Sequence, residues 1–154
     1  MNRVQLLEER VNTYLGQMGL APDQSDDGLY LFKYGSTVVM ISLFDEDDAT
    51  FVRFASIMLK DFEPSLELLE RILRLNTQVL FGAFLLFEDN TLSFSATLLG
   101  NHLDFDEFER TLRYVAKVSD DYDDEMQQLG GGQRALDVLE GDDEPSVGSD
   151  MADA

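Results

Sequence analysis

The chain has 154 residues, of which 44% are hydrophobic, and a formal net charge of −20 from 31 Asp and Glu against 11 Lys and Arg. This length can bury the core of one compact domain but not of two ordinary ones. The chain contains no cysteine, which excludes disulfides and thiolate metal sites. Its charge disfavours direct binding to nucleic acid or to anionic membranes, whereas a basic protein partner is compatible with it.

The first predicted element is an amphipathic helix over residues 2–18. Its apolar residues recur at steps of three and four, which places them on one helical face. These residues are Val4, Leu7, Val11, Leu15 and Met18. Gly19 is expected to end the helix. The N-terminal segment is charged and no apolar run reaches membrane-spanning length, so we expect a soluble cytoplasmic protein without a membrane span.

A polar loop and three meandering strands are predicted next. Residues 22–28 are polar and rich in turn formers, which indicates a loop. The strands are expected over 29–34, 37–44 and 50–59, because these runs are rich in β-branched and aromatic residues. Gly35-Ser36 and the acidic run 45–48 provide the turns between them.

A second helix is predicted over residues 65–78, after Pro64. Its apolar arc is wide, because two neighbouring lines of the helix are apolar. One line holds Leu66, Leu69 and Leu73, and the other holds Leu68, Ile72, Leu75 and Val79. Such a helix should be contacted from more than one direction, either by the sheet and another element or by a second subunit.

Residues 81–99 predict a β-hairpin with Asp89-Asn90 as its turn. The second run alternates between an apolar face and a hydroxyl-rich face. The apolar face holds Leu92, Phe94, Ala96 and Leu98, and the hydroxyl-rich face holds Ser93, Ser95 and Thr97. The first run is apolar on both faces, which predicts a strand inside the sheet.

The last predicted helix begins at Asp104, which precedes Glu107 by three residues as in a capping box. Its apolar stripe extends over Phe105, Phe108, Leu112, Val115, Tyr122, Met126 and Leu129, so the helix can lie along a sheet. The pattern stops at the three glycines 130–132. Residues 130–154 carry seven acidic residues and one base and have little to bury, which predicts a disordered acidic tail, at most transiently helical around 135–139.

Together these elements predict an α+β fold with a five-stranded antiparallel sheet. The order is helix, three strands, helix, two strands, helix, within one domain over residues 1–129, followed by the disordered acidic C-terminal tail over residues 130–154.

The predicted sheet carries large apolar side chains on both faces. In the first strand Leu29 and Leu31 point one way, and the aromatic residues of the same strand point the other way. An antiparallel sheet needs only one buried face, so the second should be covered by helices of the same chain, by an identical subunit or by a partner segment. The candidate partner-binding residues are Tyr30, Phe32, Tyr34, Phe84, Leu86, Leu68, Ile72 and Leu75.

The residues that could carry chemistry do not form a recognisable site. His102, the single histidine, lies in a predicted loop, but no cysteine is present for it to activate and no serine stands in a nucleophile-elbow context, so a surface or capping role is favoured. The acidic clusters 45–48 and 120–125 offer ligands for Ca²⁺ or Mg²⁺ but lack calcium-loop spacing, which favours solvated surfaces. Gly130–Gly132 lacks the residues of a phosphate loop. No catalytic residue, metal site or cofactor is therefore expected.

Residues 66–128 combine a leucine-rich helix ending in Asn76, a Gly-containing strand, a polar turn, a second strand and a helix with an acidic-aromatic start. With the preceding helix and strands, this order resembles the type III secretion chaperone-like fold, and the second half is similar to the bacterial YbjN-like family. The resemblance implies a small, acidic, dimeric non-enzyme that handles other proteins. It supplies no catalytic motif, and the acidic tail departs from it.

The leading functional hypothesis is a protein-binding module, either a chaperone-like protein or an assembly or regulatory factor. It would bind a partner segment through apolar contacts or β-augmentation, and its acidic surface would favour basic clients. A homodimer is expected. One alternative is an acidic regulator of a basic, nucleic-acid-binding protein, and another is a divalent-metal-dependent enzyme that uses the acidic clusters.

Overall fold

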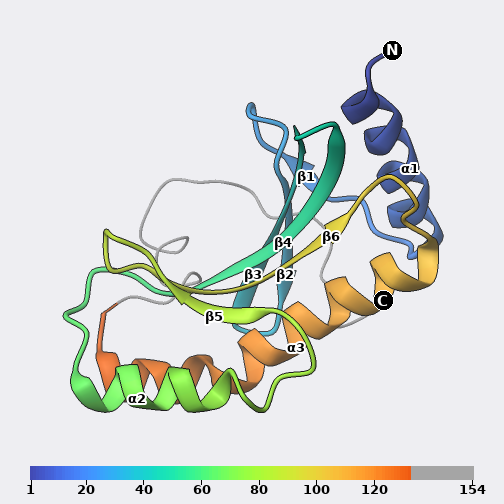
Figure 1. Ribbon diagram of the computed structural model, residues 1–154. Helices are drawn as coiled ribbons and strands as arrows, with labels where there is room; N and C mark the ends of the chain where they lie inside the picture. The colour runs from blue at the N-terminus through green and yellow to red at the C-terminus, as the bar shows by residue number, and fades with distance from the viewer. Residues whose placement is uncertain (133–154) are drawn as a thin grey trace.

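In the computed structural model, which describes residues 1–132, three helices lie on one face of a six-stranded antiparallel sheet (Figure 1). The elements are α1 (Arg3–Gln17), β1 (Asp23–Gln24), β2 (Tyr30–Tyr34), β3 (Thr37–Glu46), β4 (Ala49–Leu59), α2 (Leu66–Leu75), β5 (Ala83–Leu86), β6 (Leu92–Leu99) and α3 (Phe105–Gly130). The strand order across the sheet is β1-β2-β3-β4-β6-β5. The α+β class is confirmed. The predicted tail lies outside the described residues, apart from the glycines at its start.

The predicted strand number and element order are wrong, because the polar stretch after α1 contains a strand. In β1, Asp23 pairs with Leu31 and Gln24 pairs with Tyr30 of β2. Two paired residues are too few to show an alternation of apolar and polar side chains, so the sequence pattern indicates only a loop there. The chain therefore runs helix, four strands, helix, two strands, helix.

The prediction that the first strand of the 81–99 hairpin lies inside the sheet is also wrong. Within residues 1–132, β5 pairs only with β6 and forms an edge of the sheet. β6 instead takes the inner position and pairs with β4 through eight residue pairs. Two apolar faces show that a strand has apolar neighbours above and below, but they do not show whether it has a strand on each side.

Capping residues set the ends of the helices largely as the sequence indicates. Asn2 and Gln5 form a reciprocal capping box at α1, with hydrogen bonds of 2.8 and 2.9 Å. Asp104 caps α3 by accepting from the Glu107 backbone N–H at 2.8 Å. α2 ends at Leu75, three residues before the predicted residue 78, because the chain turns at Asn76 to reach β5.

The core lies between the sheet and the helices. Its largest fully buried side chains come from β2, β3, β4, β6 and all three helices: Phe32, Ile41, Phe54, Phe94, Phe108, Leu15, Leu68 and Leu112 are among them. The rings of Phe54 and Phe108 lie 5.4 Å apart, and the ring of Tyr14 on α1 lies 5.6 Å from that of Phe108. These contacts fix α1 and α3 on the same face of the sheet.

The turn between β2 and β3 is fastened to α3 by acidic side chains. The Ser36 backbone N–H donates to Asp120 Oδ1 at 3.0 Å, and the Ser36 hydroxyl donates to Asp123. Asp123 is buried at 3% exposure. Part of the acidic cluster 120–125, predicted to be a solvated helix face, therefore holds the hairpin against the helix.

Replacing Gly35 with alanine should lower the free energy of unfolding by about 1–3 kcal/mol. Gly35 has φ +56°, and a Cβ there would collide with the Asp120 carboxylate. Urea denaturation measures the loss. Gly16→Ala is the matched control, because no atom lies within 4 Å of its Cβ position and it lies in α1. That variant should gain about 0.5–1 kcal/mol, and an equal gain in Gly35→Ala would contradict the steric argument.

Candidate functional site

The face of the sheet that points away from the helices, here called the outer face, has no helix over it within residues 1–132 (Figure 1). The register places Met40 opposite Ala55, Ser42 opposite Arg53 and Phe44 opposite Phe51 on this face. Further positions on these two strands and on β2, β5 and β6 have the same orientation: Leu31, Lys33, Val38, Ile57, Leu85, Ser93, Ser95, Thr97 and Leu99. The outer face thus mixes apolar and small polar side chains.

One end of the outer face is hollowed into a groove of ≈ 700 Å³. This outer groove has an apolar floor and a charged rim, and the lining residues that matter here are Met40, Ala55, Ile57, Lys60, Phe87 and Glu88. Phe87 is 51% exposed. A volume of this size can take several side chains of an extended segment, and the apolar floor would remove them from water.

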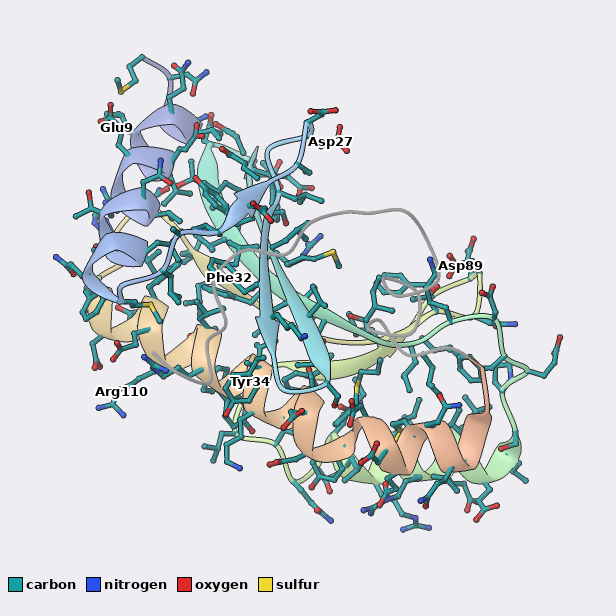
Figure 2. The ribbon with its side chains drawn as sticks, turned by 180° about the vertical axis from the view of Figure 1, so that it is seen from behind. Glu9, Asp27, Phe32, Tyr34, Asp89 and Arg110 are labelled. Atoms are coloured by element: carbon teal, nitrogen blue, oxygen red, sulfur yellow. The ribbon has the colours of Figure 1, made fainter. Side chains whose placement is uncertain are left out.

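The rim of the outer groove carries both signs of charge. Lys60 lies on the rim, as do Glu88 and Asp89 from the β5–β6 hairpin. Hydrogen bonds from Thr91 hold the pKa of the Asp89 carboxyl below its ordinary value, so this group is an anion at neutral pH. Figure 2 shows Asp89 at the hairpin tip, at the end of the molecule opposite Glu9 of α1. The groove can therefore accept a segment that bears both acidic and basic side chains.

The other end of the outer face holds an aromatic pair and a fixed cation. The rings of Phe44 and Phe51 stack at 5.3 Å. The Arg53 guanidinium lies 4.8 Å from the centre of the Phe44 ring, and its Nε donates to Thr97 Oγ1 at 3.3 Å. This end of the outer face thus carries a cation held in place by an aromatic ring and a hydroxyl, in a chain of net charge −20.

The outward edge of β5 is partly closed by Asn76. The Phe84 backbone N–H donates to Asn76 Oδ1 at 2.7 Å, and Asn76 Nδ2 donates to the Phe84 carbonyl at 3.2 Å. An added strand would need these two backbone groups. The side chain of Asn76 therefore protects the edge, and a partner segment finds fewer free backbone groups there than on an ordinary edge strand.

A second apolar surface lies on α2. This leucine surface is formed by Leu66, Leu69 and Leu73, and its first and last members are 75% and 68% exposed. The other apolar line of α2 is buried in the core, and Arg71 fixes the helix to α3 through two hydrogen bonds to Glu125, of 2.9 and 3.1 Å. Of the two apolar lines predicted for this helix, one therefore packs in the core and the other faces solvent in the single chain.

The structure places most of the predicted partner-binding residues in the core. Tyr30, Phe32, Phe84, Leu68, Ile72 and Leu75 are buried, Tyr34 is half-buried, and Leu86 is exposed. Figure 2 shows Phe32 and Tyr34 along β2. Burial raises the pKa of Tyr30 to about 12, and its hydroxyl donates to Asn12 at 2.9 Å. The buried residues cannot meet a partner unless the core opens.

The burial of these residues was not predicted, because both faces of β2 are apolar. Alternation then separates the two faces but does not tell which one the helices cover. The residues of the outer groove were missed, although β4 carries a usable signal. Its outer positions hold Arg53, Ala55 and Ile57, against larger apolar residues such as Phe54 on the alternate positions.

The residues considered for chemistry remain scattered. His102 is exposed on the loop between β6 and α3. In the 45–48 turn, Arg3 pairs with Asp45 at 3.1 Å and Asp48 at 3.7 Å. Among residues 1–132, no three His, Asp or Glu side chains gather to hold a metal ion.

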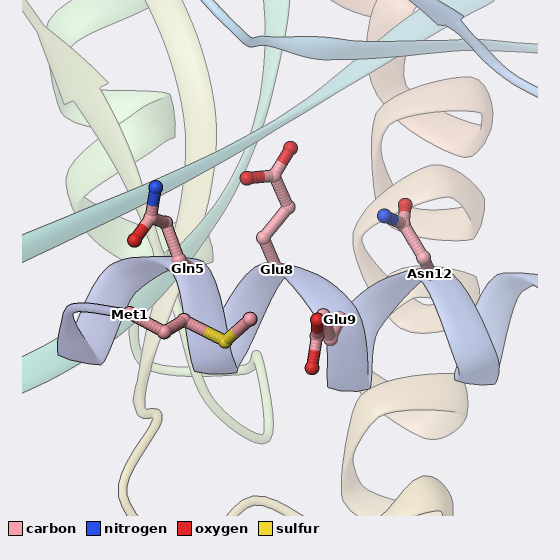
Figure 3. Close-up of a pocket in the computed structure, with 5 residues that line it drawn as sticks. All are labelled: Met1, Gln5, Glu8, Glu9 and Asn12. Atoms are coloured by element: carbon pink, nitrogen blue, oxygen red, sulfur yellow. The ribbon is translucent and has the colours of Figure 1, made fainter.

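A hollow beside α1 also lacks a site for chemistry. It is lined by Met1, Gln5, Glu8, Glu9 and Asn12, so its walls come from one helix and the N-terminal residue (Figure 3). Glu8 accepts a hydrogen bond from Gln24 Nε2 at 3.3 Å and Asn12 accepts one from the Tyr30 hydroxyl at 2.9 Å, so these two side chains connect α1 to β1 and β2. None of the helices in the described part of the chain is long and apolar enough to span a membrane.

Two solved structures share this fold over most of their length. The crystal structure of the ExsC–ExsE complex matches with a TM-score of 0.62 and 14% identity, covering 80% of this chain and 96% of that one. A crystal structure of YbjN from E. coli matches with a TM-score of 0.57 and 16% identity, covering 81% of this chain and 95% of that one. At such identities the likeness shows the fold. None of the curated proteins matches the chain.

The elements of residues 1–132 form a small α+β domain that shares its fold with ExsC and YbjN, with an apolar groove on the sheet face that has no helix over it in this range. More specifically, the chain belongs to the TY-Chap1 family, described as T3SS (YopN, CesT) and YbjN peptide-binding chaperone 1, whose model matches residues 5–138. The resemblance noted from the sequence is thereby confirmed.

Proposed function

We propose that this protein is a non-enzymatic, cytoplasmic module that binds a segment of a partner protein in its outer groove, as a chaperone-like or regulatory factor. The apolar groove on the outer face, which has no helix over it within residues 1–132, carries this proposal. The description of the family as peptide-binding chaperones supports it, and ExsC is a structural neighbour whose structure was determined in a complex with ExsE.

The partner segment contacts the groove mainly with side chains. Asn76 occupies the Phe84 backbone groups that β-augmentation along β5 would use. An extended segment presents alternate side chains to one face, so apolar residues two positions apart would rest on Ala55 and Ile57. Glu88 and Asp89 on the rim, with the acidic charge of the whole chain, favour basic residues beside this apolar pair.

The protein also forms a homodimer through the leucine surface. Leu66 and Leu73 are largely exposed leucines two helical turns apart, and Leu69 lies between them on the same line. Such a line is favourable only when a second apolar surface covers it, and two copies of α2 related by a twofold axis would cover each other. The leucine surface and the outer groove belong to different elements, so dimerisation leaves the groove open.

Selection of random peptides displayed on phage tests the groove. Peptides selected on the full chain should bind the Ile57→Asp variant at least about tenfold more weakly, because an unpaired carboxylate on the groove floor opposes burial of apolar side chains. Leu6→Asp is the matched control, since Leu6 is an exposed leucine of α1 away from the groove. Equal binding to both variants, or the absence of any selected peptide, would refute groove binding.

The high negative charge supports a second candidate function, in which the protein is an acidic regulator of a basic, nucleic-acid-binding protein. Binding dominated by surface charge weakens steeply as salt rises, whereas binding dominated by apolar burial in the groove does not. A salt titration of the same peptides therefore separates these two functions.

A further inference from the structure

We propose that the outer groove, in the absence of a partner, is occupied by the chain's own residues 135–140, Ala-Leu-Asp-Val-Leu-Glu. This inference rests on the proposed function, since it names the regulation of the same site. The partner segment would then have to displace this internal segment before it binds.

The chain leaves α3 at the rim of the groove. The Gly131 N–H donates to the Gln127 carbonyl at 2.8 Å, and Gln127 Nε2 donates to the Gly132 carbonyl at 2.9 Å. A Cβ at Gly132 would lie 2.8 Å from Phe62 Cβ and would overlap the carbonyl of Lys60. Because Lys60 also lines the groove, the segment that follows Gly132 starts beside it.

The chain that follows Gly132 is long enough to reach the residues that line the groove. Leu136 follows Gly132 by four residues and Val138 follows it by six. At about 3.3 Å per residue, an extended chain can carry these side chains about 13 and 20 Å from Gly132. No long linker is needed, so the local concentration of the segment at the groove is high, on the order of millimolar.

The chemistry of the segment matches the groove. Leu136 and Val138 alternate with Asp137, so an extended chain presents two apolar side chains to the apolar floor. Arg134 complements the rim carboxylates Glu88 and Asp89, and Asp137 complements Lys60. The family match also continues through residue 138, six residues beyond Gly132, so the family's sequence pattern includes the start of this segment.

A pair of engineered cysteines in the full chain tests this occupancy. The natural chain has no cysteine, so only the introduced pair can form a disulfide. Ile57→Cys combined with Leu136→Cys should close an intramolecular disulfide under mild oxidation at least about tenfold faster than Leu6→Cys combined with Leu136→Cys. Equal rates would overturn the proposal. Disulfide-linked dimers in place of linked monomers would also overturn it, since a second copy's segment would then fill the groove.

Competition provides a second measurement in the full chain. Leu136→Asp with Val138→Asp should raise the affinity for a phage-selected peptide about tenfold, because the groove is no longer occupied. Val147→Asp with Met151→Asp adds the same charge farther along the chain and should leave the affinity unchanged. An unchanged affinity in the first variant would overturn the proposal.

The two measurements distinguish this inference from the proposed function. Disulfide closure needs no partner, so closure without any selected peptide would support the internal segment and refute partner binding in the groove. The opposite result is also informative. If selected peptides bind and need Ile57, but the engineered cysteine pair forms no intramolecular disulfide, partner binding is supported and the internal segment is refuted.

Discussion

Replacing Phe94 with alanine should lower the free energy of unfolding by about 3–5 kcal/mol, because a fully buried aromatic side chain is removed and a cavity remains. Phe94 lies on β6 with its ring 4.9 Å from that of Phe84 and 6.2 Å from that of Tyr114. It therefore connects the edge strand β5 to α3. Since a domain of this size is stable by only about 5–15 kcal/mol, the variant should lose much of its stability.

Urea denaturation followed by circular dichroism measures this loss. Leu99→Ala is the matched control on the same strand, because Leu99 is 62% exposed and its truncation should change the stability by no more than about 0.5 kcal/mol. Similar losses in the two variants would show that Phe94 is not packed as the structure has it.

Introducing glutamate at Leu66 and Leu73 together should convert the proposed homodimer into a monomer. Both leucines are more than two-thirds exposed in the single chain, so the substitutions should leave the fold intact. In a dimer, however, the leucine surfaces of two copies face each other, and four carboxylates would be desolvated without basic partners, at a cost of several kcal/mol. Light scattering at micromolar concentrations should show the mass fall by half.

Leu6→Glu provides the control, because it places one glutamate at an exposed leucine of α1 and should leave the dimer mass unchanged. A monomer mass for the unmodified chain would rule out the homodimer. A dimer mass that persists in the double variant would place the interface elsewhere on the molecule.

Local sequence patterns were sufficient to predict the bounds and the buried face of an element wherever one side of that element differs clearly from the other. α1 has a single apolar stripe and a capping Asn2, and it begins and ends within a residue of the prediction. The alternation in β6 correctly assigned Phe94 to the buried face and Thr97 to the exposed face. In α3 the cap at Asp104 and the apolar stripe were both correct, because they depend only on neighbours within a few residues.

Local sequence patterns were insufficient to predict the covered face, or the position in the sheet, of strands that are apolar on both sides. Tyr30 and Phe32 were assigned to a partner, yet they lie beneath the helices, and β5 was assigned to the interior, yet it forms an edge. For β2, the local sequence pattern fits burial of either face. For β5, it fits a position at the edge of the sheet as well as one inside it. The choice between them depends on which distant segment lies alongside, as when β6 pairs with β4 and leaves β5 outside.

The amino-acid sequence alone determined the elements, their buried stripes and the acidic charge of this protein, because these follow from spacing and from side-chain chemistry within a few residues. Tertiary structure decided which face of the sheet the helices cover, and it thereby separated the buried Phe32 from the groove residue Ile57. The physical reason is that covering a face requires contacts between residues far apart in the chain, and a short window of sequence contains only one side of each contact.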